Sequence, residues 1–181
     1  MPPKAKHDQE YLLQKAIELI KEDGLDGFTS RAIAARIGVS TTPLLSVFSS
    51  MEQLRSNVLS KLLLEQSRIL DDHGLPAWIQ LLASQVVYSW KEPKAGQALK
   101  IYLQKEARET SWKKLLALLR AEDDSKHLSD DQLAQVAFRA IVYTTGMADL
   151  AQQGYLYNPS KEGILADLKR TLKQLVFGGF E

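Results

Sequence analysis

The residues best suited to catalytic or metal chemistry are few and do not converge. His7 falls in an N-terminal arm, His73 at a predicted helix end and His127 in a predicted loop. None of them pairs with a carboxylate or another histidine at metal-ligand spacing, and the sequence has no phosphate-binding glycine loop or nucleophile motif. The acidic run at residues 122–124 is interpreted as a solvated loop. We therefore predict no enzyme, no metal site and no cofactor.

A different chemistry is indicated by two short amphipathic helices predicted between residues 29 and 54. In the first, Ile33, Ala34 and Ile37 recur at the spacing that places side chains on one helical face. Gly38 follows directly and can adopt the left-handed conformation that ends a helix at little steric cost. The first helix is therefore expected to end in a tight glycine turn.

The second helix begins just after this turn. Ser40, Thr41 and Thr42 are candidate caps, and Pro43 fits the first helical turn, where its missing N–H would have had no partner. The inward-facing residues are Leu44, Val47 and Phe48, and small polar groups occupy the opposite face. This arrangement is typical of a helix-turn-helix, whose second helix lies in the DNA major groove while the first crosses the backbone.

Together with its flanks, the segment resembles the N-terminal part of TetR-family transcriptional regulators. A preceding helix, a Gly-to-Phe-Thr turn and a following Ser-Met-Glu-Gln-Leu segment occur at one fixed spacing over about the first third of the chain. The residues that carry the resemblance are Leu13, Ala16, Leu19, Ile20, Gly24, Phe28, Thr29, Arg31, Ile33, Ala34, Gly38, Val39, Ser40, Leu44, Phe48 and Leu54. The resemblance implies an all-helical regulator that binds double-stranded operator DNA.

Three positions depart from the family's pattern. Where the family has a tyrosine, an aromatic or histidine and a lysine that touch phosphates, this chain has Leu45, Val47 and Met51. By the resemblance, the groups that remain to contact DNA phosphates are side-chain hydroxyls and the N–H groups at helix starts. The resemblance also makes Arg31 the candidate for a bidentate contact with guanine. The implied DNA-contacting set is Thr29, Ser30, Arg31, Ser40, Thr41, Thr42, Pro43, Ser46 and Ser49.

The predicted DNA-binding region is nearly neutral. Residues 1–62 contain eight Lys or Arg and seven Asp or Glu, a net charge of +1. DNA affinity rests largely on the neutralisation of phosphates by Lys and Arg side chains. With so low a net charge, the positive side chains must therefore lie together on the DNA-facing side of the domain to bind DNA well. An arm that contains Lys4, Lys6 and His7 either reaches the DNA or is a solvated terminus.

The composition of the 181 residues agrees with a cytoplasmic globular protein. The chain is 45% hydrophobic and 25% charged, which is ordinary for one or two domains with a core. No apolar run approaches the roughly 18 to 20 residues that span a bilayer, and the start lacks the apolar region of a signal peptide. Because the chain has no cysteine, disulfides and thiolate metal sites are excluded. We expect no membrane partner.

Beyond residue 50 every segment is predicted to be helical, which gives an all-α fold of about nine helices. Capping boxes at Ser50 with Gln53 and at Ser129 with Gln132 open two of these helices. The predicted helices run from 50 to about 73 and over 75–90, 95–108, 111–121, 129–152 and 160–177, with 122–126 as a loop. We assign 1–50 to a three-helix helix-turn-helix DNA-binding domain and 51–181 to a helical effector-binding and dimerisation domain.

The last two predicted helices are rich in apolar residues. The helix over 129–152 has an apolar stripe and, beside it, a second apolar flank, so it requires burial on two sides. The last helix has a leucine-rich face. The flank contains Phe138 and Val142. The resemblance implies a homodimeric four-helix bundle here, formed by Leu133, Ala137, Ile141, Leu168 and Leu172. The alternative is that both helices close the core of a monomer.

Aromatic residues cluster in the middle of the chain. In TetR-like proteins this region often holds an apolar ligand cavity, and tryptophan and tyrosine provide large faces with one polar group each. We choose Tyr102, Trp112, Tyr143 and Met147 as ligand-binding residues, because their helices are expected to face inward. The implied effector is an unknown, mostly apolar small molecule.

The preferred interpretation is a cytoplasmic homodimeric repressor that releases its operator when the effector binds. The alternative is a TetR-like dimeric ligand- or protein-binding module with a degenerate, non-specific DNA reader. The replaced phosphate contacts and low charge favour the alternative, whereas the intact turn, the caps and Arg31 favour the regulator.

Overall fold

The computed structural model describes residues 8–70, 74–105 and 107–177, without the side chains of Thr42, Pro43, Leu45, Val176 and Phe177. Within these ranges the chain forms nine α-helices, a short 3-10 helix at Asp123–Ser125 and no strand, which confirms the all-α prediction. The helices are α1 (Gln9–Asp23), α2 (Ser30–Ile37), α3 (Thr41–Val47), α4 (Met51–Arg68), α5 (Ala77–Lys91), α6 (Pro93–Lys105), α7 (Arg108–Arg120), α8 (Asp130–Gln152) and α9 (Lys161–Phe177). His73 and the arm with Lys4, Lys6 and His7 lie outside the described residues.

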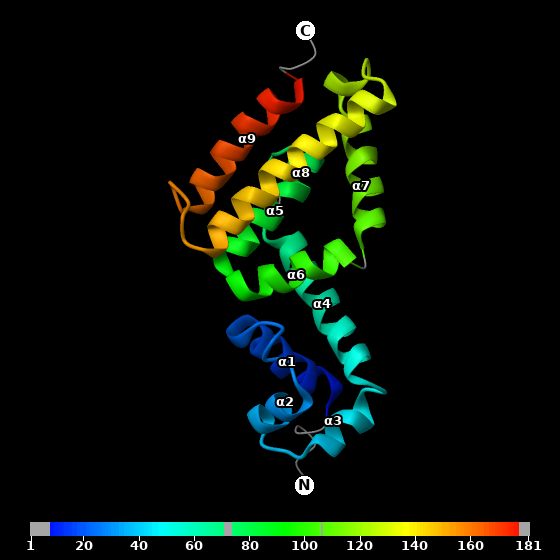
Figure 1. Cartoon of the computed structure of the whole chain (residues 1–181), viewed down its shortest axis with the longest axis vertical. Coiled ribbons are helices and arrows are strands. Elements are labelled where there is room, and N and C mark those ends of the chain that lie inside the picture. The colour runs from blue at the N-terminus through cyan, green and yellow to red at the C-terminus, as the bar shows by residue number, and fades with distance from the viewer. Residues whose placement is uncertain (1–7, 71–73, 106, 178–181) are drawn as a thin grey trace.

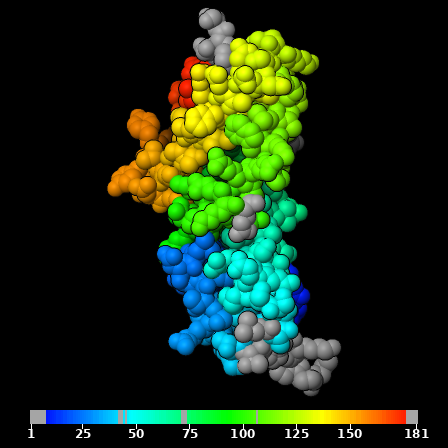
Figure 2. Space-filling model, turned by 45° about the vertical axis from the view of Figure 1, so that its right-hand side comes forward, coloured from blue at the N-terminus to red at the C-terminus, as the bar shows by residue number. Residues whose placement is uncertain are grey.

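The helices form two groups at opposite ends of an elongated molecule (Figure 1). We call α1–α3 the reader and α5–α9 the body. Helix α4 leads from the reader into the body, where α5 packs against both α8 and α9. A space-filling view shows the reader, in blue, in direct contact with the green body, with α4 in cyan beside it (Figure 2). The reader therefore meets the body along a surface as well as through the connecting helix.

Local signals define the ends of the helices. Gly38 ends α2 with φ 75° and ψ 36°, and its N–H donates to the carbonyl of Ala34 at 3.0 Å. Ser129 and Gln132 form the predicted capping box at the start of α8. At α4 only half of the predicted box forms: the Ser50 hydroxyl accepts from the Gln53 N–H, but the Gln53 side chain accepts from the preceding serine.

Two hydrophobic cores stabilise the two groups. The reader core buries residues of α1, α2, α3 and α4, but it also contains Tyr88 of α5 and Ala95, Ala98 and Leu99 of α6. The body core is formed by α5, α7, α8 and α9, with Trp78 among its fully buried side chains. Helix α6 therefore belongs by sequence to the body and by packing partly to the reader.

Four of the five residues predicted to form the dimer face are buried within the chain itself. Leu133, Ala137, Leu168 and Leu172 are at most 4% exposed because they pack into the body core of their own chain, and Ile141 is half-buried at its edge. A second chain cannot contact side chains that are already enclosed. The flank on the other side of α8 is open instead, with Phe138 62% and Val142 55% exposed.

Candidate nucleic-acid interface

The first turn of α2 presents the residue predicted to contact a base. Thr29 is the N-cap of α2, and its hydroxyl oxygen accepts a hydrogen bond from the Ala32 N–H at 3.1 Å. Arg31 is exposed two residues later, and Ser30 is half-buried between them. Because Thr29 uses its oxygen to cap the helix, its hydroxyl hydrogen remains the group able to bond a phosphate oxygen.

Helix α3 presents a mixed surface. Ser40 and Ser46 are exposed and Thr41 is half-buried. Ser40 occupies the N-cap position without a side-chain capping bond. Leu44 and Phe48 are buried beneath the helix and fix it on the reader core. The side chains of Thr42, Pro43 and Leu45 lie outside the described part of the chain.

Two of the three departures from the family's pattern have a packing role. Val47 and Met51 are half-buried and pack against the reader core. Ser49, also in the predicted contact set, directs both its N–H and its hydroxyl to the Gln53 side chain, at 2.9 and 2.8 Å. These positions therefore stabilise the junction between α3 and α4.

Charge near the reader is partly neutralised within the chain. Arg36 pairs with Glu22, and this hydrogen bond, the largest cause, raises the pKa of the guanidinium. Lys61 pairs with Glu10 at 3.3 Å. Arg55 lies over the Phe28 ring, 6.0 Å from its centroid. Such pairing lowers the number of cations free to displace counterions from DNA.

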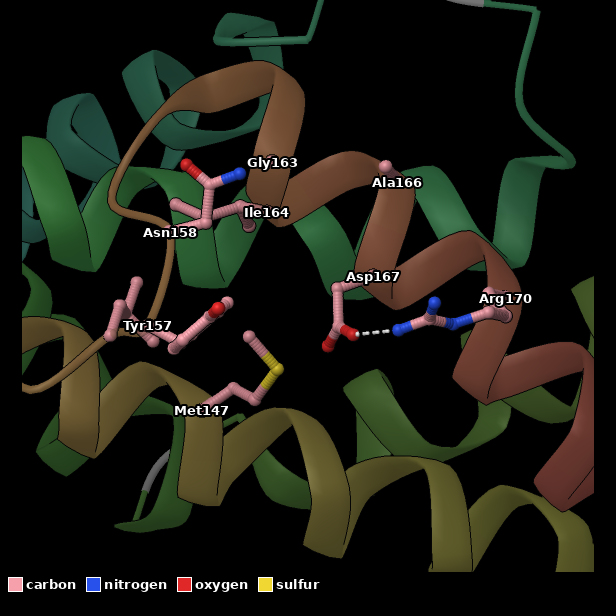
Figure 3. Close-up of a pocket in the computed structure, with 9 residues that line it drawn as sticks. Met147, Tyr157, Asn158, Gly163, Ile164, Ala166, Asp167 and Arg170 are labelled. Atoms are coloured by element: carbon pink, nitrogen blue, oxygen red, sulfur yellow. Dashed lines mark hydrogen bonds and ion pairs between the residues drawn. The ribbon is translucent and has the colours of Figure 1, made fainter.

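The four predicted ligand residues do not line one cavity. Tyr102 packs against the reader core, whereas Trp112 packs against the body core. Met147 lines a cavity between the end of α8, the following loop and α9 (Figure 3). The Tyr143 hydroxyl donates to Asp167, another lining residue, at 2.6 Å. Burial first, and then this hydrogen bond, raise the pKa of Tyr143.

The cavity has a volume of about 340 Å³ and a mixed lining. Apolar groups of Met147, Leu156 and Ile164 form part of its wall. Asp167 accepts a hydrogen bond from Arg170 at 2.9 Å, so the polar side carries one carboxylate and one guanidinium (Figure 3). Sequence reasoning missed both residues, although their spacing of three places them on one side of α9.

No helix in the described ranges is long and apolar enough to cross a membrane. Likewise, no cluster of three or more His, Cys, Asp or Glu that could hold a metal ion occurs among the residues that the structure describes.

Known proteins resemble the chain at two levels. Residues 12–58 match the sequence model of the family described as "Bacterial regulatory proteins, tetR family". The crystal structure of a TetR-like transcriptional regulator from Rhodococcus sp. RHA1 superimposes with a TM-score of 0.66 at 18% sequence identity, over 96% of this chain and 97% of that one. No curated protein matches the chain in sequence. The match to residues 12–58 covers α2 and α3, which carry most of the predicted DNA contacts, together with most of α1 and the first part of α4.

Proposed function

Because residues 12–58 match the TetR-family model and the fold is TetR-like, we propose that this chain is a TetR-family transcriptional regulator, a homodimeric repressor that a small molecule releases from its operator. The observation that carries the proposal is the reader itself. Two short helices meet at the left-handed Gly38, and Arg31 and Ser46 are exposed on them. A dimer would present two such helix pairs to successive turns of the major groove.

Selection from a pool of genomic fragments tests DNA recognition directly. The purified protein should enrich fragments that share a near-palindromic site. Arg31→Ala should cost about 1–3 kcal/mol per base contact and relax the preference at one symmetric pair of positions. Arg108→Ala, which removes an exposed arginine at the start of α7, is the matched control and should leave affinity unchanged.

Failure of this selection would favour the other candidate function, a TetR-like dimeric ligand- or protein-binding module with a degenerate reader. Two observations support that alternative: Arg36 is paired with Glu22, and Val47 and Met51 pack inward. If no fragment is enriched above random DNA even at low salt, the repressor proposal is refuted and the alternative takes its place.

For the dimer we propose the outer face of α8 in place of the predicted residues. Phe138 and Val142 are exposed, although they lie on a helix whose opposite side is fully packed. Half-buried Ile141 and Thr145 flank them. An obligate dimer of this kind buries roughly 2,000 Å² or more in total, of which these apolar side chains would form the centre.

For the effector we propose the cavity beside Met147. Its apolar wall suits a mostly hydrocarbon molecule, and its Asp167–Arg170 pair suits one or two polar groups. Tyr102 and Trp112 pack in different cores, so the proposal keeps only Met147 and Tyr143 from the predicted set. Met147→Ala should weaken effector binding and leave operator affinity without effector nearly unchanged. Equal effector affinity in Met147→Ala would remove this cavity from the proposal.

A further inference from the structure

A small network of charged and polar groups lies where the reader meets the body. The Lys21 ammonium, near the end of α1, is 2.7 Å from a carboxylate oxygen of Glu65 on α4 and 3.6 Å from one of Glu92, the C-cap of α5. The Tyr88 hydroxyl of α5 donates to the same Glu65 oxygen at 3.2 Å. One lysine thus joins the reader to the connecting helix and to the body.

A second polar contact joins the same surfaces a few residues further on. Lys94, in the first turn of α6, donates to the backbone carbonyl of Glu22. Gly24 ends α1 beside it with φ 77°, and a Cβ added there would lie 3.8 Å from the Lys94 Cβ. The end of α1 therefore contacts both α4 and the α5–α6 turn.

The surroundings make the network stronger than an ordinary surface pair. The Lys21 side chain is 27% exposed, and it faces two carboxylates at once. Burial alone lowers the pKa of Lys21, but the hydrogen bond and charge of Glu65, together with Glu92, outweigh that effect and leave the pKa raised. The ammonium form is therefore the stable one at neutral pH, and its removal leaves two carboxylates close together without their shared cation.

The reader is joined to the body in three ways: through α4, through the apolar packing of α6 against the reader core, and through the polar network around Lys21. The apolar packing is not directional in the way an ion pair is, so the polar network can select one orientation among those that the packing allows. We propose that Lys21 is a positioning residue that holds the reader, and with it α2 and α3, in one orientation on the body. The inference rests on the proposed function, since orientation matters to DNA binding only if the reader recognises an operator. In a dimer, this orientation sets the separation of the two recognition helices.

The orientation can be measured without DNA. Because the chain has no cysteine, Ala35→Cys on α2 and Ala117→Cys on α7, both at exposed positions, provide two unique attachment sites for spin labels. The distance between the two labels reports the orientation of the reader on the body. Dilution with unlabelled protein restricts the measured distance to pairs within one chain, whatever the oligomeric state. Lys21→Met keeps most of the apolar stem and removes the charge. Lys15→Met is the matched control, because Lys15 pairs with Glu18 inside α1 at the same 2.7 Å and with a similar exposure of 30%.

Lys21→Met should broaden or shift the distance distribution, whereas Lys15→Met and the conservative Lys21→Arg should reproduce the parent. Operator affinity of Lys21→Met should fall about two- to fivefold, since only part of the population keeps the competent orientation. An unchanged distance distribution in Lys21→Met overturns the proposal, even if the variant is less stable. A parent protein that binds no operator refutes the proposed function instead, and the distance measurement still decides the role of Lys21.

Discussion

The outer face of α8 gives the sharpest prediction, because it carries one large, exposed side chain whose contribution to a dimer can be calculated from its buried surface. Phe138 is 62% exposed in a single chain. Full burial of a phenylalanine contributes roughly 1.5–3 kcal/mol, so burial of the remaining surface against a partner contributes about 1–2 kcal/mol per protomer. A two-fold interface contains the residue twice. Phe138→Ala should therefore weaken the dimer by about 2–4 kcal/mol, a rise of about 30- to 900-fold in its dissociation constant.

Sedimentation across a range of protein concentrations measures this constant directly. Leu64→Ala is the matched control, since Leu64 is 44% exposed but lies on α4, away from α8. Circular dichroism at low concentration should show equal helicity for the parent and both variants, because neither exposed side chain is part of a core. If Phe138→Ala dimerises as tightly as the parent, the outer face of α8 is not the interface. If the parent itself sediments as a monomer, the dimer is refuted altogether.

Four other substitutions test the packing and the reader. Leu172→Ala should lower the free energy of unfolding by about 2–5 kcal/mol in urea titrations, because the side chain is fully buried in the body core. A decrease of less than about 0.5 kcal/mol in the free energy of unfolding would contradict that burial. Met51→Lys should steepen the salt dependence of operator binding by nearly one unit per added phosphate contact, and an unchanged slope would show that this position does not face the phosphates. Gly96→Ala should lower the free energy of unfolding by about 1–3 kcal/mol, because the new Cβ would lie 2.8 Å from the Ser89 Cα. Gly146→Ala should raise the free energy of unfolding by up to about 1 kcal/mol, because a Cβ there meets nothing within 4 Å and alanine favours a helix more than glycine does. Changes of the same sign in the two variants would refute this comparison.

The reader could be predicted from sequence because its signals are local. Gly38 can end a helix by virtue of its own conformational freedom, and Leu44 and Phe48 are placed inward by helical spacing alone. Helix ends were less accurate: α6 begins at Pro93, two residues before the predicted start, because proline is accommodated in a first turn. That Arg31 contacts DNA remains a prediction.

The side of α8 that faces the chain's own core could not be predicted, for a different physical reason. Both sides of α8 carry apolar residues, and periodicity cannot state which side faces the chain's own core. The stripe with Leu133 and Ala137 faces inward, so the flank with Phe138 is left outside. The cavity was equally inaccessible to sequence reasoning, since the bond between Tyr143 and Asp167 joins residues 24 positions apart on two helices.

The shared reader core has a consequence for the modularity of the protein. Ala95, Ala98 and Leu99 of α6 close the hydrophobic core that α1–α4 begin, so a fragment cut after α4 would expose apolar surface that the whole chain covers. Grafting the reader onto the body of another protein of this fold would require α6, or a surface shaped like it, to be transplanted as well. Substitutions on α6 and α1 are therefore expected to be constrained together, and recombination between proteins of this fold would succeed more readily after α6 than at the end of α4.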